Sequence, residues 1–420
     1  MREDWEMKKL GDVCDLQNGY AFRSKWYVES SNTLNIRMSN IRPDGSFDPD
    51  HNIRYLPDDL AEEYSKYILE EGDLVIAMTD MANDPKILGL PTLVKNLKGR
   101  KFLLNQRVGK LKDFSDDIYV PYLRYYLSSP VIKEYYKSKG AGGLQINIGK
   151  KDILTAEIPI PPLPEQKQIV EILGEAFAAL DRAKANIEQN IQNAEELFQS
   201  KLNGIFSERG EGWETFQVKG LGDVITGTTP PTKDKSNYGD YIPFVKPGHF
   251  QPDGSLNSED SMLSKKGLDN GRLIQEKSVL MVCIGASIGK TGYTDNPVSS
   301  NQQINAVTPN EDFNSKLIYY GMISKNFLNQ VFLNASQTTL PIINKTKWSN
   351  LTLNLPVNKN EQRKIIFNLD DIRAETISLL NSYRSKIESL EQLKKSILQQ
   401  AFSGQLTGEG DHRVVAGSSS

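Results

Sequence analysis

Three stretches of the sequence hold residue types that could do chemistry, but none has the spacing which that chemistry requires. Gly285–Thr291 ends in Gly-Lys-Thr, yet a phosphate-binding loop needs its first glycine where Ile284 stands. Such a loop also opens a helix, whereas Gly292–Pro297 is typical of turn and loop. Glu165-Gln166-Lys167 has the acid and the lysine of some nuclease sites. The same acid recurs in Glu361-Gln362-Arg363, and helix-start chemistry explains both better.

The titratable and nucleophilic residues do not assemble into a catalytic set either. His51, His249 and His412 have no metal-ligand spacing with one another, and Cys14 and Cys283 are the only cysteines. We find no Ser-His-Asp set, metal cluster, dinucleotide fingerprint or methyl-donor fingerprint. No apolar run is long enough to cross a bilayer, and Met1-Arg2-Glu3-Asp4 does not begin a signal peptide. We therefore expect a non-catalytic chain without a metal or cofactor of its own, in a reducing cytoplasm.

What remains is the chemistry of nucleic-acid recognition. The net charge of -3 argues mildly against it, but Lys95–Lys112 holds seven basic residues and no acidic one, and Lys133–Lys151 holds five lysines against Glu134 alone. Asn and Gln side chains can read adenine, Arg and Lys can read guanine, and Ser or Thr can hold phosphates. An ordinary solvated turn is the alternative for any single residue. The loops taken together favour nucleic acid.

The candidate DNA-binding residues lie in both halves of the chain. In the first half they are Arg37, Arg42, Lys86, Lys98, Arg100, Lys101, Arg107, Lys137, Lys139, Gln145 and Asn147. In the second half they are Lys246, His249, Lys290, Gln303, Thr338, Asn344, Lys345 and Lys347. The segment Asn296–Asn310 has no basic residue, so the phosphate contacts of the second half are expected from its lysines and from His249.

The elements that must position these residues occur twice. An offset of 196 carries Glu165-Gln166 to Glu361-Gln362, and an offset of 209 carries Pro43-Asp44-Gly45 to Pro252-Asp253-Gly254. Each copy begins with short β-rich runs separated by turn residues and continues with short helical patterns. The β-rich runs include Thr33–Arg37, Asp73–Ala77, Ile242–Val245 and Val279–Cys283, and the helical patterns lie around Pro121–Tyr136 and Ser315–Phe332. We predict two α+β modules in pseudo-two-fold tandem repeat.

A proline-rich entry and a long proline-free helix follow each module, over Glu165–Phe206 and Glu361–Phe402. Alternating steps of four and three keep apolar residues on one face. The predicted helix-pairing residues are Leu173, Leu180, Ile187, Leu197, Leu369, Leu379, Leu390 and Leu393. Asn190 and Lys386 are polar at matching positions and are expected to fix the register. A pseudo-two-fold axis requires the helices to pair antiparallel; the alternative is that each packs on its own module.

In this order and repeated twice, these motifs resemble the specificity subunit of type I restriction-modification enzymes. The most telling stretches are Ile158–Ile169 and Asn360–Ile365, with further support from Gly72–Met78 and Ser396–Thr407. The resemblance extends to about Gly408. It implies two target-recognition domains that each read one half of a split DNA site. It also implies helices that space the domains and dock methyltransferase subunits.

The resemblance also implies the partners and the domain boundaries. The partners are double-stranded DNA, two methyltransferase subunits and restriction subunits, with S-adenosylmethionine, ATP and Mg²⁺ bound by the partner subunits. The two half-sites are expected about one turn of DNA apart, roughly 34 Å. The predicted segments are recognition domain 1–157, spacer and helix 158–207, recognition domain 208–355, spacer and helix 356–407, and a disordered or engineered tail 408–420. Two alternatives remain: a coiled-coil scaffold that does not bind DNA, and a free-standing nucleotide-binding enzyme.

Overall fold

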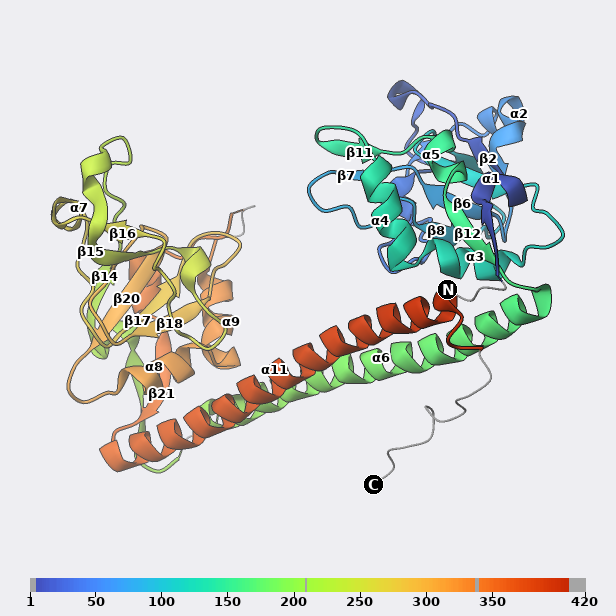
Figure 1. Ribbon diagram of the computed structural model, residues 1–420. Helices are drawn as coiled ribbons and strands as arrows, with labels where there is room; N and C mark the ends of the chain where they lie inside the picture. The colour runs from blue at the N-terminus through green and yellow to red at the C-terminus, as the bar shows by residue number, and fades with distance from the viewer. Residues whose placement is uncertain (1–4, 208–209, 337–339, 408–420) are drawn as a thin grey trace. The chain divides into compact units, whose positions relative to one another are not determined.

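The computed structural model describes residues 5–207, 210–336 and 340–407. The chain divides into two compact units, the first built from Met1–Ala185 with Ile387–Ser420 and the second from Asn186–Lys386. Each unit holds one module and part of each long helix. Each module contains a four-stranded antiparallel sheet with the corresponding strand order, together with short helices (Figure 1), so the predicted α+β tandem repeat is confirmed. The segment 408–420, predicted as a tail, lies outside the described residues.

Two small sheets form the first module. One is antiparallel, in the order β2 (Asp15–Asn18), β10 (Val108–Lys112), β6 (Leu74–Ala77) and β8 (Pro91–Leu93). The other has the order β4 (Tyr55–Leu56), β3 (Thr33–Ile36), β9 (Lys101–Leu104) and β5 (Ile68–Leu69), with β3 and β9 parallel. All four residues of β6 are buried because alternate side chains enter two different cores.

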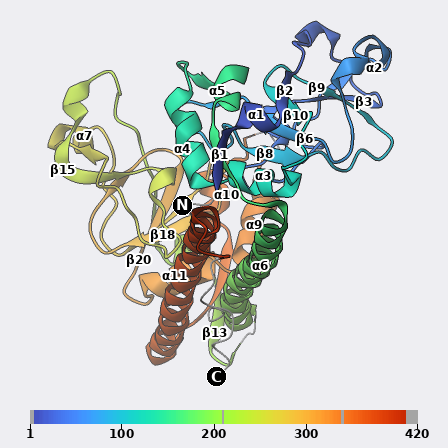
Figure 2. The same cartoon turned by 45° about the vertical axis from the view of Figure 1, so that its right-hand side comes forward.

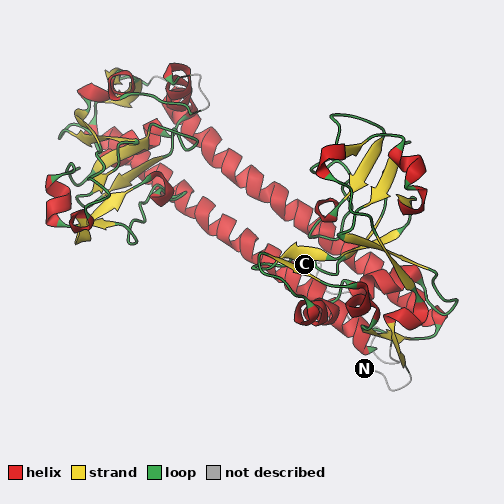
Figure 3. Ribbon diagram, turned by 90° about the horizontal axis from the view of Figure 1, so that it is seen from above, coloured by secondary structure: helices red, strands yellow, loops and turns green. Residues whose placement is uncertain are grey.

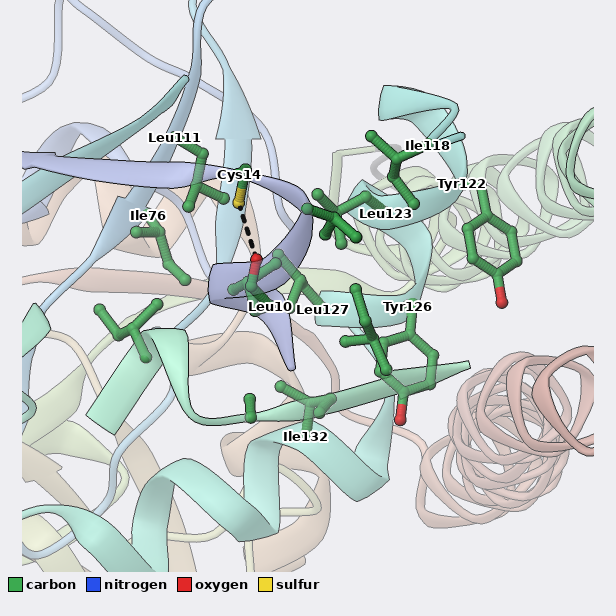
Figure 4. Packing of buried hydrophobic residues seen from close by; sticks show 14 of the residues in the cluster. Leu10, Cys14, Ile76, Leu111, Ile118, Tyr122, Leu123, Tyr126, Leu127 and Ile132 are labelled. Carbon is green, nitrogen blue, oxygen red and sulfur yellow. Dashed lines mark hydrogen bonds between the residues drawn. The ribbon is translucent and has the colours of Figure 1, made fainter. Parts of the chain in front are cut away.

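Two short ribbons and five helices complete this module. The ribbons pair β7 (Thr79–Met81) with β11 (Gln145–Asn147), and β1 (Glu6–Lys9) with β12 (Glu157–Ile160). The helices are α1 (Leu10–Val13), α2 (Leu60–Glu63), α3 (Val120–Leu127), α4 (Pro130–Lys139) and α5 (Lys150–Leu154). Leu10, Leu123 and Leu127 meet in the larger core (Figure 4). The helical pattern of the sequence is broken at Ser129, where Pro130 starts a new helix.

The second module repeats this plan. Its antiparallel sheet has the order β14 (Gly222–Thr226), β20 (Ile304–Pro309), β17 (Ser278–Val282) and β18 (Thr291–Thr294). A smaller sheet has the order β16 (Met262–Leu263), β15 (Tyr238–Val245) and β19 (Ser299–Ser300), with β15 and β19 parallel. β13 (Trp213–Gln217) pairs with β21 (Thr352–Pro356). The helices are α7 (Lys265–Asp269), α8 (Ser315–Met322), α9 (Lys325–Asn334) and α10 (Lys345–Ser349).

The long helices are α6 (Leu163–Ser207) and α11 (Lys359–Ser403), and both run without a break (Figure 3). Each has 45 residues, which at 1.5 Å per residue gives roughly 68 Å. In the first unit Leu173, near the start of α6, shares a core with Leu398 and Phe402 at the end of α11. In the second unit Leu202, near the end of α6, shares a core with Leu369 of α11. The helices therefore pair antiparallel.

Each module is attached to its long helix by a glutamate and a buried glutamine. The Trp5 indole donates to Glu165 and the Trp213 indole donates to Glu361, with N–O distances of 3.2 and 2.7 Å. Gln166 is fully buried; it accepts from the Tyr119 amide and donates to two backbone carbonyls, each at 2.8 Å. Gln362 makes the equivalent three bonds. The Glu-Gln repeat is therefore a structural joint, as helix-start chemistry predicts.

Packing of α3 against the helix pair reinforces this joint in the first unit. The rings of Tyr122 and Tyr126 lie edge-on to Phe402, with centroids 5.5 and 4.9 Å apart. Figure 2 shows α3 between the strands and the long helices. Both tyrosine hydroxyls donate to carbonyls of β12, so these side chains bury an apolar ring without leaving a polar atom unpaired.

The contact face of the long helices departs from the strict heptad that the sequence suggested. Leu173 and Leu369 are buried, and Leu180, Ile187 and Leu390 are partly buried. However, Leu197, Leu379 and Leu393 are 58%, 42% and 47% exposed, so their assignment as helix-pairing residues is wrong. The neighbouring Phe198 and Leu380 are buried instead. Asn190 and Lys386 are also exposed, and Ile191 and Ile387 lie closer to the contact face.

The reason for the departure is geometric. A straight helix has 3.6 residues per turn, so an apolar stripe drifts by about 20° per heptad relative to a repeat of 3.5. Over 45 residues that drift moves the contact face by one position. In the second half of α6 the less exposed residues include Ile187, Ile191, Ala194, Phe198, Leu202 and Phe206, which are separated mostly by steps of four.

Candidate nucleic-acid interface

The parallel strand pair of the first module brings distant arginines to one sheet edge. β3 and β9 run in the same direction, with Ile36 opposite Leu104, so the chain leaves both strands at the same edge. Arg37 follows β3 directly, and Arg107 lies in the turn that follows β9. The Asn105 amide donates to the Ile36 carbonyl at 3.0 Å and fixes this turn beside the end of β3. Two of the predicted DNA-binding residues, Arg37 and Arg107, are thereby placed at this edge.

A third arginine reaches the same edge from the antiparallel neighbour β4. The Asn35 amide donates to the Arg54 carbonyl at 2.9 Å, which places Arg54 beside the last residues of β3. Arg54 is not among the residues predicted to bind DNA, because it stands alone between Ile53 and Tyr55. Only the pairing of β3 with β4 reveals its position. We name Arg37, Arg54 and Arg107 the arginine edge.

The charges of the arginine edge are not neutralised by carboxylates. Within the described residues, none of its three guanidinium groups forms an ion pair. Arg37 Nη2 donates to the Asn52 carbonyl at 2.7 Å, and Arg54 Nη1 donates to the Ile53 carbonyl at 3.0 Å. Arg37 Nε is buried without a partner. Burial lowers the pKa of Arg37, and repulsion from Arg54 and Arg107 lowers it further.

The second module has the same backbone at the corresponding edge but different side chains. The Phe244 amide donates to the Ser261 carbonyl at 2.8 Å, and the Asn301 amide donates to the Val245 carbonyl at 3.1 Å. These bonds match those made by Asn35 and Asn105 in the first module. Lys246, Ser261 and Gln303 therefore occupy the places of Arg37, Arg54 and Arg107. One cation and two neutral side chains replace three cations.

Both modules also share the turn that follows this edge. Asn40 caps the 3₁₀ turn after Arg37, its side-chain oxygen accepting from the Arg37 amide at 2.8 Å. His249 does the same after Lys246 through Nδ1 at 3.2 Å, and its Nε2 lies 3.3 Å from Asp260. Burial is the main cause that lowers the pKa of His249. The structure thus gives this predicted DNA-binding histidine a capping role.

A cavity of about 430 Å³ lies beside the arginine edge in the first module. Arg42 and Lys86 line it, together with Ser39, whose buried hydroxyl has no hydrogen-bond partner. The Asp80 carboxylate holds the loop on one side by accepting from the amides of Met81, Ile87 and Leu88. Lys86 is paired with Asp84 at 3.2 Å. Two residues predicted to bind DNA, Arg42 and Lys86, therefore line a cavity in which Asp80 holds part of the backbone in place.

The ribbon of β7 and β11 positions the predicted amides Gln145 and Asn147. The Thr79 hydroxyl donates to the side-chain oxygen of Asn147 at 2.7 Å. The backbone amide of Asn147 donates to the Ala141 carbonyl at 2.9 Å. Gln145 is partly buried and Asn147 is exposed. Lys137 is paired with Glu134 at 2.9 Å, and Lys139 lies 5.5 Å from the centroid of the Tyr135 ring.

The basic run Lys95–Lys112 does not form one surface. Lys101 begins β9 and Arg107 follows its other end, so the strand separates them. Lys98 and Lys101 are exposed. Arg100 is committed to the fold: its guanidinium pairs with Asp50 at 2.6 Å, donates to the Leu97 and Asn96 carbonyls, and lies over Phe102. Arg100 is thus a structural residue, which the charge pattern alone could not indicate.

In the second module the glycine-rich loop leads into a strand. Thr291 begins β18, whereas the sequence suggested turn and loop. The loop is held by a bond from the Gly285 amide to the Pro341 carbonyl at 2.9 Å, and Lys290 is exposed. Without a following helix, the loop has no helix N-terminus with which to bind a phosphate. The nucleotide-binding alternative therefore loses the feature that suggested it.

The remaining predicted residues of the second module have mixed roles. Asn344 caps α10 by accepting from the Lys347 amide at 2.9 Å, and Lys347 Nζ donates to the Asn334 carbonyl at 3.1 Å. Lys345 is exposed on the same helix. Gln303 donates to the Ile284 carbonyl at 3.4 Å. Thr338 lies outside the described residues.

The cysteines have environments that suit the core. Burial raises the pKa of both Cys14 and Cys283 to about 12, so neither is a thiolate at neutral pH. The Cys14 thiol donates to the Leu10 carbonyl at 3.4 Å (Figure 4). Across the described residues, no group of three or more His, Cys, Asp or Glu side chains could hold a metal ion. In that part of the chain no helix is long and apolar enough to cross a membrane.

Two modules with one backbone and different edge chemistry define a tandem recognition protein. The model of the family described as "Type I restriction modification DNA specificity domain" matches the chain twice, over residues 2–194 and 210–389. These ranges cover most of the chain, so the chain belongs to this family. Each match covers one module and most of the long helix that follows it, so the family that the resemblance implied is confirmed.

Individual relatives agree with this assignment. The type I restriction enzyme EcoAI specificity subunit of Escherichia coli is 27% identical over 184 residues, which are 43% of this chain and only 30% of that subunit. The putative type I restriction enzyme MjaX specificity subunit of Methanocaldococcus jannaschii is 22% identical, over 96% of this chain and 94% of its own. A chain from a structural study of complex assembly and conformational transition in the type I R-M system superposes with a TM-score of 0.73. At 20% identity, over 96% of this chain and 99% of that one, this likeness shows the fold.

Proposed function

We propose that each module reads one half of an asymmetric, interrupted DNA site, and that α6 and α11 space the modules and dock methyltransferase subunits. One observation carries the proposal: the two modules share a backbone at the sheet edge but present different side chains there. At this edge one module has Arg37, Arg54 and Arg107 and the other has Lys246, Ser261 and Gln303, so the two modules differ in charge and in the side chains that surround a bound DNA. Two different readers on one chain would recognise two different half-sites.

Partner subunits supply the chemistry in this proposal. Methyltransferase subunits would bring S-adenosylmethionine, and restriction subunits would bring ATP and Mg²⁺ for translocation and cleavage. We expect two methyltransferase subunits, because the tandem repeat offers one docking surface for each copy. The scaffold alternative, without DNA, has no structural feature in its favour that the recognition proposal does not also explain. It would leave the three unneutralised arginines without a role.

A module exchange tests the proposal. Residues 1–157 would be replaced by the corresponding module of a relative, and the methylated sites of cells that carry the chain with its methyltransferase subunits would be mapped. The expected result is a changed first half-site with the second half-site and the gap retained. The reciprocal exchange of residues 208–355 is the matched control and should change the other half-site. A change in both halves, or in neither, would contradict modular reading.

A further inference from the structure

The arginine edge has a charge arrangement that the fold itself does not need. Three guanidinium groups converge at the ends of β3, β4 and β9 without a carboxylate among the described residues. Burial is the main cause that lowers the pKa of Arg37, and repulsion from Arg54 and Arg107 acts in the same direction. By contrast, Arg100 in the same module is paired with Asp50. A cluster that stays unpaired in a module where another arginine is well paired indicates an external anion.

We propose that Arg37, Arg54 and Arg107 form a phosphate-binding site that positions the DNA backbone against the first module, and that the second module lacks its counterpart. The inference rests on the proposed function, since DNA is the source of the phosphate. It specifies the residues that bind the DNA backbone, and it predicts that the two modules differ in their electrostatic contribution to DNA binding.

The buried groups around Arg37 support an anionic ligand. Arg37 Nε is a buried donor without an acceptor, and a buried donor left unpaired lowers the stability of the fold. The neighbouring Asn35 is 2% exposed and donates to the Tyr27 hydroxyl at 2.8 Å. Tyr27 in turn interacts electrostatically with Arg37. The Arg37 side chain is therefore held in a polar, partly buried setting in which the described residues supply the Asn52 carbonyl as an acceptor but no carboxylate.

Three converging cations favour phosphate over a base edge. One guanidinium is enough to bind the O6 and N7 atoms of guanine, which carry no net charge. A second and a third arginine near the first would only add repulsion in that complex. A phosphate group carries a full negative charge and several acceptor oxygens, so it relieves the repulsion and accepts from more than one guanidinium.

The second module provides an internal comparison. Its edge has Lys246, Ser261 and Gln303 on the same backbone, and Lys246 Nζ lies 5.7 Å from the centroid of the Phe244 ring. Ser261 is buried and Gln303 is neutral, so neither adds a charge that would release counterions from DNA. The first module should therefore contribute more of the salt dependence of DNA binding than this edge of the second module does.

The test converts the first edge into the second. The double variant Arg54→Ser with Arg107→Gln would be prepared in the full chain together with its methyltransferase subunits. Binding of labelled duplexes with and without the mapped site would be measured between about 50 and 200 mM salt. Each lost phosphate contact lowers the slope of log K against log salt by about 0.9, so a decrease of roughly 1.8 is expected on both duplexes. The methylated sequence should stay the same.

The matched control is Arg100→Gln, which removes a guanidinium already paired with Asp50 at 2.6 Å and should leave the slope unchanged. An unchanged slope in the double variant would overturn the site while leaving the proposed function intact. So would a changed base preference in the first half-site, because the arginines would then read bases. If the unaltered complex did not distinguish the two duplexes, the proposed function itself would fail. Thermal unfolding of each variant verifies that it is folded.

Discussion

At the scale of single residues, the most informative side chains are the two buried glutamines at the joints. Gln166 and Gln362 each use one amide group to satisfy three backbone groups, two of them in loops of the adjoining module. A buried amide that makes every bond stabilises both the turn and the angle at which the helix leaves the module. The repeated Glu-Gln pair in the sequence is explained by this role.

Replacing Gln166 by methionine should therefore be costly. Methionine has a similar shape but leaves the Tyr119 amide and two carbonyls without partners in a buried place. We expect the free energy of unfolding to fall by about 2–4 kcal/mol. Urea denaturation followed by circular dichroism measures the change.

The control for this variant is Gln192→Met on the exposed part of the same helix. Its amide donates only to Glu196, one turn later, at 2.7 Å. Such a pair contributes about 0.2–0.5 kcal/mol. Equal losses in the two variants would mean that Gln166 is no more important than any surface glutamine.

At the scale of elements, the long helices were the easiest part to predict and their register was the hardest. The absence of proline and the apolar stripe indicated both helices to within a few residues. The stripe did not distinguish Leu379 from Leu380, because two adjacent leucines satisfy either repeat. Only packing against the partner helix decides, and that packing follows the natural drift of a straight helix.

Two alanine variants of these leucines test the register. Leu380 is 9% exposed and Leu379 is 42% exposed. Leu380→Ala should lower the free energy of unfolding by about 2–3 kcal/mol, because it empties a buried site. Leu379→Ala should cost less than about 1 kcal/mol. Thermal or urea unfolding of both variants gives the comparison, and a larger loss for Leu379 would restore the strict heptad.

The sheet edge could be predicted only in part for a related reason. Arg107 is a candidate because it belongs to the basic run Lys95–Lys112, and Arg37 because arginine can contact DNA, but that run suggested one basic surface. β9 carries the chain across the sheet within that run and leaves Lys101 and Arg107 at opposite ends. Arg54 entered the edge through the pairing of β3 with β4, which links residues far apart in sequence. A count of charged residues along the sequence cannot show that a strand separates two basic residues, nor that strand pairing brings a third arginine to the same edge.

At the scale of the whole molecule, comparison of the two copies of the tandem repeat shows which structural features they share and which side chains differ. The joints, the Pro-Asp-Gly turns and the backbone of the sheet edges are the same in both copies. Gly45 and Gly254 even share a φ of 82°, a conformation that favours glycine in a tight turn. The side chains at the edges differ. A chain built in this way keeps one backbone framework while the side chains that the framework presents differ between its two copies.

The last prediction concerns the spacing that the long helices are proposed to set. The boundary between the compact units falls after Ala185 in α6 and after Lys386 in α11. Inserting seven helix-forming residues at both places adds about two turns, or roughly 10 Å. At 3.4 Å per base pair, the gap between the half-sites should widen by about three base pairs. Mapping methylated sites in cells measures the gap directly.

Insertion into α6 alone is the control for this experiment. The two helices would then differ in length and their apolar residues could no longer face one another along the whole pair, so methylation should be lost rather than redirected. Matched insertions keep the pairing, because seven residues turn a helix by nearly two full revolutions. If the matched variant methylated its original site with the original gap, the helices would not be the spacer. The gap would then have to be set by the methyltransferase subunits.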